Sequence, residues 1–320
     1  MCYTIYMAQK KNKKQYLQLF LTGFGMGSAD VIPGVSGGTI AFISGIYQEL
    51  LYSIKVATGE FLKLFFKGQF KKAFAVLPFH FLVPLFTGIM AAVFTLAELL
   101  SYLLDTSPVY VWSFFFGLVI ASIVIVMKRV GVWKLSYKVS FAVAAILTYF
   151  LVSAIPVVTP DTLPVFFLSG MIAISAMILP GISGSFILLL LGKYQQILAA
   201  VTERDFLTLA VFMAGCIVGI ALFARFLTWL FKHYHDISVA ILAGVMLGSV
   251  QKLWPWKETI MTRVNSHGEV VPLVEKNIFP EAFDMTIIFA LILAVVGAFI
   301  IIQLDKMKLT KERTDDIEMK

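Results

Sequence analysis

Two short segments, far apart in the chain, carry proline, glycine and serine in the same order. The first reads Pro-Gly-Val-Ser-Gly-Gly from Pro33, and the second reads Pro-Gly-Ile-Ser-Gly-Ser from Pro180. Proline ends a helix and glycine allows close backbone approach, so each segment predicts a break followed by a new helix. The first N–H groups of that helix lack partners and form the positive end of its dipole. This arrangement is typical of a site that binds an anion with neutral groups.

The candidate anion ligands are the backbone and hydroxyl groups of these two segments, joined by one cation. Ser36 and Ser183 are expected to cap the new helices or to donate to a ligand. Thr39 and Ser185 follow them as further hydroxyl donors. For a single copy, a tight turn that packs two helices together is the alternative, but two matching copies favour binding. The full predicted set is Pro33, Gly34, Ser36, Gly37, Gly38, Thr39, Gly181, Ser183, Gly184, Ser185 and Arg225.

Three ionisable residues, Asp30, Glu98 and Arg225, fall inside apolar stretches. At the centre of a membrane helix each costs about 2.5–3.5 kcal/mol, which makes each a functional candidate. Asp30 precedes Pro33 by three residues, and its counterpart in the second segment is Met177. Glu98 is either a coupling-proton site or a side chain that reaches water, and Arg225 either meets a phosphate or extends to the lipid headgroups at the membrane surface. We take Asp30 and Glu98 as the candidates for ion coupling.

Histidine and cysteine provide no further candidate site. The four histidines lie at the ends of apolar stretches or in a loop, without metal-ligand spacing. Cys2 and Cys216 are too few for a disulfide framework. The sequence contains no nucleophile–base arrangement, and Asp30 is the one acid near the two segments. We therefore expect no metal, no cofactor and no enzymatic activity.

The elements that position these residues must cross a membrane. Hydrophobic residues make up 59% of the 320 residues and charged residues 14%, with mean hydropathy +0.89. Soluble domains are about half apolar and a quarter charged, so we expect one all-α membrane domain over residues 1–320. Uninterrupted apolar stretches predict transmembrane helices at Phe79–Leu104, Tyr110–Met127, Ser140–Val158, Phe206–Phe231, Ser238–Leu253 and Phe283–Ile302.

The two proline-glycine segments interrupt two further apolar blocks, Leu17–Ile54 and Leu163–Ala200. Each arm of such a block has about 16 residues, or roughly 24 Å of helix, which is short for a core of roughly 30 Å. A re-entrant hairpin that enters and leaves on the same face is therefore expected from each block. Irregular backbone at membrane depth is tolerated only where protein or a wet cavity surrounds it.

The chain contains an internal repeat. Ser28–Leu51 aligns with Ser175–Leu198 at an offset of 147, with eleven of 24 positions identical. Further along, the offset is 127, and it pairs Gly88 with Gly215, Gly117 with Gly244 and Ser122 with Ser249. We expect a first repeat at 16–158, a second at 162–304 and a cytoplasmic tail at 305–320. Three crossings per repeat invert the second, and broken helices at matching places in inverted repeats indicate a transport site near the midplane.

The distribution of basic residues predicts the orientation. With the N-terminus inside, nineteen Lys and Arg residues fall on the inner side and six on the outer side, and Arg225 lies in the membrane. This bias follows the positive-inside rule and places both termini in the cytoplasm. The net charge of +7 therefore indicates the anionic inner leaflet and not nucleic acid.

The residues ADVIPGVSGGTIAFISGIY and ILPGISGSFILLLLGKY closely resemble a bacterial family of polyprenyl-phosphate transporters of the PopT type. The resemblance covers nearly the whole chain. It implies that the anion is the phosphate of undecaprenyl phosphate, a carrier lipid for cell-wall sugars that is recycled from the outer to the inner leaflet. Moving an anion inward opposes an inside-negative potential by about 2.3 kcal/mol per charge per 100 mV. We therefore hypothesise co-transport of H⁺ or Na⁺ in the cytoplasmic membrane.

Two other functions fit part of this pattern. A small-anion channel or exchanger of the chloride type also places helix N-termini at the midplane of inverted repeats. It needs a closed aqueous path, whereas a lipid transporter needs a groove open sideways to the bilayer. A membrane enzyme such as a lipid phosphatase needs a His/Arg/Ser constellation, which this sequence lacks.

Overall fold

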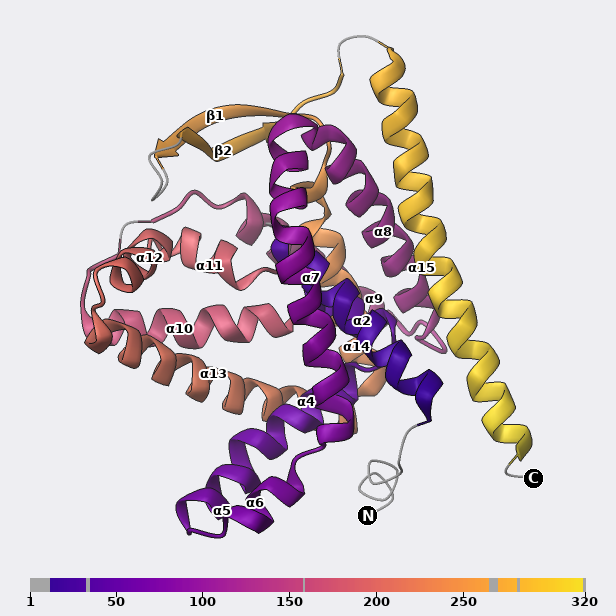
Figure 1. Cartoon of the computed structure of the whole chain (residues 1–320). Coiled ribbons are helices and arrows are strands. Elements are labelled where there is room, and N and C mark those ends of the chain that lie inside the picture. Colours follow the sequence, from indigo (N-terminus) through magenta and orange to yellow (C-terminus); the bar gives the residue numbers. More distant parts are fainter. Residues whose placement is uncertain (1–11, 33–34, 158, 265–269, 281–282, 319–320) are drawn as a thin grey trace.

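The computed structural model describes residues 12–32, 35–157, 159–264, 270–280 and 283–318. Over these residues the chain is helical except for one two-stranded antiparallel hairpin (Figure 1). Six helices are long and apolar enough to cross a membrane, which confirms the six uninterrupted spans and a multi-pass membrane protein. They are α7 (Phe79–Thr106), α8 (Pro108–Lys128), α9 (Leu135–Ser153), α13 (Phe206–His233), α14 (His235–Ser249) and α15 (Met285–Glu318).

One predicted boundary was wrong. The span expected at Ser140–Val158 is helix α9, which begins at Leu135 and ends at Ser153. Its C-cap, Ala154, already has extended backbone dihedral angles. Pro156 explains the early end, because a proline clashes with a helical conformation at the residue before it.

Both interrupted blocks are broken where the proline-glycine segments predict, and each is broken a second time. The first block forms α2 (Lys13–Val31), α3 (Gly37–Ile43) and α4 (Tyr47–Val56). The second forms α10 (Leu163–Ile178), α11 (Gly184–Leu190) and α12 (Tyr194–Thr202). The prediction of one helix after each proline-glycine segment was therefore wrong. Two short helices follow each segment, and in the second block α11 and α12 meet at 104°.

A repeated glycine accounts for the second break. Gly45 and Gly192, which are 147 residues apart, have φ angles of +73° and +63°. Residues other than glycine rarely adopt this left-handed backbone conformation, so glycine allows the chain to turn at each of these positions. Their identity in the aligned repeat therefore has a structural cause.

The helices pack in pairs, and the closest contacts recur at the offsets of the repeat. In the α2–α7 pair, a Cβ atom added to Gly23 would lie 2.1 Å from the carbonyl oxygen of Leu85, and one added to Gly88 would lie 2.1 Å from that of Phe20. Glycine lets the two backbones approach to this distance. A larger side chain at either position would force the helices apart.

The α10–α13 pair has the corresponding contacts. A Cβ atom on Gly170 would lie 2.4 Å from the carbonyl oxygen of Phe212, and one on Gly215 would lie 2.0 Å from that of Phe167. All four residues follow their counterparts in α2 and α7 by 147 or 127 residues. The other two pairs each combine a helix of the first half with one of the second: α8 packs along α15, and α9 packs along α14.

The inner and outer helices differ in burial. Within their most apolar stretches, 56% of the residues of α8 and 61% of those of the span formed by α14 and the turn after it are buried. For α7, α9, α13 and α15 the share is 17–22%. The outer four therefore present mostly apolar surface, as expected of helices that face lipid, and the core lies around α3, α8 and α14.

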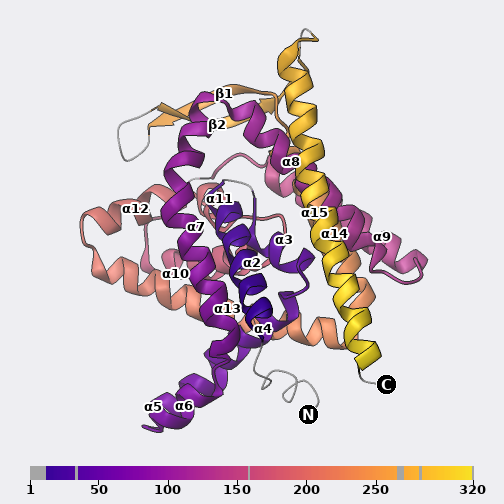
Figure 2. The ribbon, with the colours of Figure 1, turned by 45° about the vertical axis from the view of Figure 1, so that its right-hand side comes forward.

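Two smaller elements extend from opposite ends of the helical body. At one end the β-hairpin joins β1 (Lys257–Val264) to β2 (Val270–Asn277). At the other, where α15 ends, a π-helical turn η1 (Ala57–Phe61) leads into α5 (Leu62–Phe66) and α6 (Phe70–Val76) (Figures 1 and 2). The β-hairpin was missed by the sequence analysis, which treated this region as an outer loop.

Candidate functional site

The first candidate tip lies between α2 and α3. Pro33 and Gly34 lie outside the described residues. Ser36 is the N-cap of α3, and its Oγ accepts a hydrogen bond of 3.1 Å from the N–H of Gly38, which confirms the predicted cap. Ser36 and Thr39 are both buried, with 1% and 0% of their surface exposed, so this tip is closed to solvent.

Asp30 lies directly against this helix start. The N–H of Gly37 donates a 2.7 Å hydrogen bond to Asp30 Oδ1. A Cβ atom added to Gly37 would lie 2.6 Å from Asp30 Oδ2, so the glycine leaves room for the carboxylate. The position where an anion was expected is thus occupied by an acidic side chain of the protein itself.

The first tip meets the end of the helix before the second tip. The Tyr47 hydroxyl donates a 3.1 Å hydrogen bond to the Ile178 carbonyl. Ser36 Oγ lies 3.5 Å from the carbonyl oxygen of Met177 and 3.4 Å from that of Leu179. These are the last carbonyls of α10, which lack partners inside their own helix. The two broken blocks, more than 130 residues apart in sequence, therefore form one junction in the core.

Thr39 adds an unused polar group to this junction. Its Oγ1 is fully buried and has no hydrogen-bond partner among the described residues. A buried hydroxyl left without a partner costs about 1–3 kcal/mol. A ligand that accepts a hydrogen bond there would recover that cost.

The second tip is more open than the first. Gly181 has φ +91°, and a Cβ atom on it would lie 2.5 Å from Ser249 Oγ at the end of α14. Ser183 occupies the N-cap position of α11 without a side-chain cap, and its Oγ lies 2.8 Å from that of Ser185. Ser183 is partly exposed and Ser185 is exposed. The second tip thus offers two hydroxyls and the start of α11 at an accessible surface.

A cation near the second tip was missed by the sequence analysis. Lys252 lies just after α14, and its Nζ sits 4.8 Å from the ring centre of Phe186, the residue after Ser185. From the sequence alone, Lys252 is one of the six basic residues expected on the outer side. No sequence signal links it to the tip, because the contact depends on how α14 packs against α11.

Lys257 secures the β-hairpin beside these elements. Its Nζ lies 3.9 Å from the ring centre of Trp112 on α8 and 3.3 Å from a carboxylate oxygen of Glu275. Burial lowers the pKa of the Lys257 ammonium, and the neighbouring Glu275 carboxylate opposes this change. The buried Lys257 ammonium therefore connects the β-hairpin to the start of α8.

Two further basic side chains form hydrogen bonds near the second break of each block. At the end of α3, Arg129 donates to the carbonyls of Phe42 and Ile43 at 2.9 and 2.7 Å. Between α11 and α12, the fully buried Lys193 donates to the Thr159 carbonyl at 2.8 Å. Arg129 also lies 3.4 Å from the Asp305 carboxylate, and Lys193 forms an ion pair with Asp161. Both cations were counted only as loop charges in the sequence.

The structure places Arg225 and Glu98 at other locations. The Arg225 guanidinium, on α13, donates a 3.1 Å hydrogen bond to the carbonyl of Thr58 in η1. Glu98 is exposed on α7. Their predicted roles in anion binding and ion coupling stay predictions.

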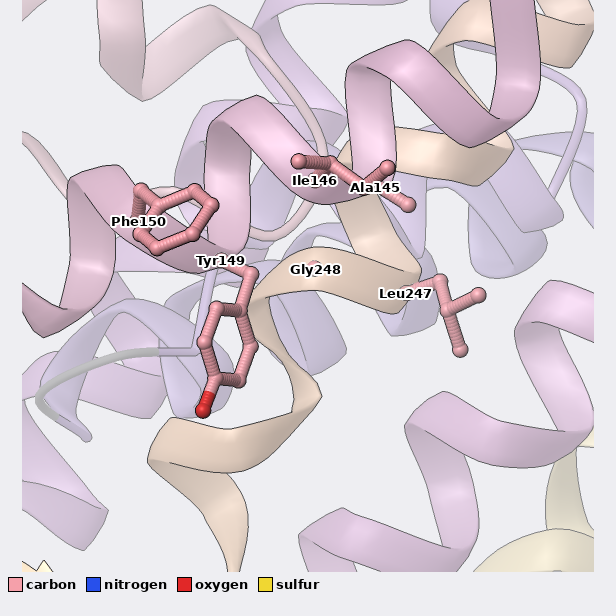
Figure 3. A pocket seen from close by; sticks show the side chains of 6 residues that line it. All are labelled: Ala145, Ile146, Tyr149, Phe150, Leu247 and Gly248. Atoms are coloured by element: carbon pink, nitrogen blue, oxygen red, sulfur yellow. The ribbon is translucent and has the colours of Figure 1, made fainter. Parts of the chain in front are cut away.

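An apolar groove runs beside the second tip. It has a volume of about 380 Å³ and lies between α9 and α14 (Figure 3). Gly248, on its floor, is the residue before Ser249, which contacts Gly181. Its lining residues are Ala145, Ile146, Tyr149, Phe150, Leu247 and Gly248. Within the described part of the chain, no cluster of three or more His, Cys, Asp or Glu side chains could hold a metal ion.

Comparison with known proteins identifies the family to which the chain belongs. Residues 26–271, which include both tips, match the family described as undecaprenyl phosphate translocase-like. The chain belongs to this family. Membership makes it a membrane transporter and not an enzyme.

Two relatives extend the match over most of the chain. A polyprenyl-phosphate transporter from Vibrio cholerae is 42% identical over 297 residues, which cover 91% of this chain and 96% of the relative. A polyprenyl-phosphate transporter from Staphylococcus aureus is 31% identical over 254 residues, which cover 73% and 85%. No solved structure matches the chain.

Proposed function

We propose that this protein moves undecaprenyl phosphate from the outer to the inner leaflet of the bacterial cytoplasmic membrane, coupled to the inward movement of H⁺ or Na⁺. Membership of the undecaprenyl phosphate translocase-like family supports the substrate. The observation that carries the mechanism is the junction between the tips, where Ser36 and Tyr47 meet the last carbonyls of α10. These hydrogen bonds join the starts of α3 and α4 to the end of α10 in the buried core, which supports a shared polar site.

The two halves form inverted repeats with both termini in the cytoplasm. The glycine contacts of α2–α7 and α10–α13, which recur at offsets of 147 and 127, support a common architecture of the halves. The excess of Lys and Arg on one side supports the orientation. In this arrangement the start of α3 and the start of α11 approach the midplane from opposite faces.

The second tip receives the phosphate. Ser183 and Ser185 supply hydroxyls at an accessible surface, and the Lys252 ammonium lies beside them. A phosphate in hydrocarbon faces an idealised cost on the order of 20 kcal/mol per charge, which these donors offset. Thr39 and the N–H groups of α3 then form the next set of donors at the junction.

Asp30 couples this step to an ion. In the structure its carboxylate accepts the Gly37 N–H, which a phosphate at the first tip would need. Two anions at one helix start repel each other, so Asp30 must be neutralised by H⁺ or Na⁺, or withdraw, when the phosphate arrives. Glu98 is the second coupling candidate, on the surface of α7.

The polyprenyl tail stays in the lipid beside the protein. The groove between α9 and α14 is almost wholly apolar, and its lining residue Gly248 precedes Ser249, which lies against Gly181 of the second tip. Its exposure on the outer surface lets a chain lie in it while the headgroup is bound. This groove favours a lipid substrate over a small anion, which needs a closed aqueous path.

Reconstituted vesicles containing undecaprenyl phosphate test the proposal. The loss of headgroup accessibility from one leaflet is followed over time, and chloride flux is measured in parallel. We expect protein-dependent lipid translocation that the Ser36→Ala/Ser183→Ala double variant loses. Thr95→Ala is the matched control, because Thr95 is exposed on α7 and its hydroxyl donates to the Ala91 carbonyl of its own helix. Chloride flux without lipid movement would contradict the proposed substrate.

A further inference from the structure

Helices α5 and α6 form a hairpin that only the first half of the chain carries. The change of the repeat offset from 147 to 127 corresponds to 20 additional residues here. The hairpin projects from the helical body at the end where α15 terminates (Figures 1 and 2). Between α12 and α13 of the second half, where the structure describes every residue, there is no such element, so the hairpin lies outside the part of the chain that recurs at the two offsets.

The hairpin exposes a continuous aromatic surface. Phe66, Phe70 and Phe74 are 82%, 53% and 50% exposed. Neighbouring rings contact one another with centroids 5.1–6.3 Å apart, from Phe61 through to Phe79. Soluble surfaces rarely carry such a patch, whereas a membrane interface accommodates it.

Basic side chains accompany these rings. Lys63, Lys67, Lys71 and Lys72 are all exposed, and residues 62–76 contain no acidic residue. Exposed aromatic and lysine side chains on one short helical element are typical of segments that lie in the headgroup layer. Each lysine near an anionic surface is worth about 1 kcal/mol, or about fivefold in local lipid concentration.

The base of the hairpin is fixed to the transporter. In η1, the carbonyl of Thr58 accepts the hydrogen bond from Arg225 on α13. In a π-helical turn the backbone hydrogen bonds join residues five apart instead of four. Such turns often occur at functional positions. Arg225 thereby connects the base of the hairpin to α13.

We infer that the α5–α6 hairpin lies in the headgroup layer and binds anionic phospholipids of the surrounding membrane. Phe66 and Phe70 enter the acyl boundary, and the four lysines contact lipid phosphates. The assignment to the cytoplasmic leaflet rests on the proposed orientation, while the binding itself does not. The hairpin keeps the transporter at a fixed depth in the leaflet to which the lipid is delivered.

A fluorophore on the full-length protein tests this inference. An environment-sensitive label is attached through Phe66→Cys in a chain with Cys2→Ala and Cys216→Ala. The protein is placed in vesicles of phosphatidylcholine with and without phosphatidylglycerol, and quenching by spin-labelled forms of each lipid is measured. A label attached through Glu258→Cys, on β1 at the opposite end, is the control.

We expect membrane-like emission from the label at position 66 and stronger quenching by spin-labelled phosphatidylglycerol than by spin-labelled phosphatidylcholine. The quadruple variant Lys63→Gln/Lys67→Gln/Lys71→Gln/Lys72→Gln should lose this preference and keep its translocation rate. Water-like emission in both vesicles, or equal quenching by both lipids, would overturn the inference. A preference that appears only after undecaprenyl phosphate is added would also overturn it, since the surface would then belong to the substrate path. The label reports without transport, so a failure of the protein with all four lysines to translocate the lipid would count only against the proposed function.

Discussion

The two hairpin tips have the same sequence pattern but offer different chemistry. The first is closed, with Ser36 and Thr39 buried and the Asp30 carboxylate bonded to the start of α3. The second is open, with exposed Ser185, the start of α11 and a nearby lysine, and it has Met177 where the first has an acid. The same sequence pattern thus gives two helix starts whose surroundings differ. One tip carries its own anion, and the other is free to receive one.

The largest effect is expected from closing the second tip. Gly181→Val places a branched side chain at φ +91°, at a strain of about 1–3 kcal/mol, and its Cβ would clash with Ser249 Oγ. We expect translocation to fall to the background rate and thermal stability to drop. Gly131→Val is the control, because no atom lies within 4 Å of a Cβ atom there. Equal activity of the two variants would show that the second tip is not needed.

The next largest effect is expected from removing the Asp30 carboxylate, which the first tip has and the second lacks. If one H⁺ or Na⁺ enters with each singly charged lipid, a 100-fold inward gradient of that ion changes the accumulation ratio of the lipid by up to about 100-fold, which corresponds to about 2.8 kcal/mol. Asp30→Asn should remove this dependence, because the start of α3 no longer carries a charge that must be neutralised. The ratio is measured in vesicles with an imposed H⁺ or Na⁺ gradient. Undiminished dependence in Asp30→Asn would remove Asp30 from the mechanism.

A smaller effect is expected from the cation beside the second tip. Hydrogen bonds to charged groups contribute about 1.5–3 kcal/mol, so Lys252→Gln should weaken headgroup binding by about tenfold or more. The concentration of undecaprenyl phosphate at half-maximal rate measures this change. Lys276→Gln, at an exposed position of β2, is the matched control. The same shift in both variants would indicate a general charge effect and not a site.

The smallest effect is expected from Glu98. Its carboxylate is exposed on α7, so replacing it by an amide removes no contact with either tip among the residues that the structure describes. Glu98→Gln should reduce gradient dependence by less than about fivefold if Asp30 is the main coupling group, a margin set by the roughly 0–1 kcal/mol typical of exposed charges. The same gradient assay compares the two variants. A larger loss in Glu98→Gln than in Asp30→Asn would reverse their roles.

Local sequence patterns predicted the elements well. Long apolar stretches gave the six spans, and proline with glycine gave the first break of each block. These features depend on the composition of one segment and its preference for lipid or for helix. The second breaks also had a signal, because Gly45 and Gly192 recur in the repeat, but an identity alone does not reveal a positive φ angle.

Contacts between distant segments could not be predicted in this way. Asp30 was placed near the first tip, but its bond to Gly37 depends on how the chain folds back after α2. Arg129 and Lys252 read as loop charges, because their partners lie on helices from other parts of the chain. The β-hairpin has two eight-residue strands with several β-branched residues, a weak signal in a chain dominated by apolar helices.

Protection of the second tip by the lipid tests the central claim most directly. A cysteine introduced by Ser185→Cys, in a chain with Cys2→Ala and Cys216→Ala, is labelled with a maleimide in vesicles, and Thr95→Cys serves as the control. If the headgroup binds at this tip, undecaprenyl phosphate should slow labelling at position 185, undecaprenol without phosphate should not, and position 95 should be unaffected by either. Equal labelling rates at position 185 with and without undecaprenyl phosphate, in vesicles that still translocate the lipid, would contradict the account.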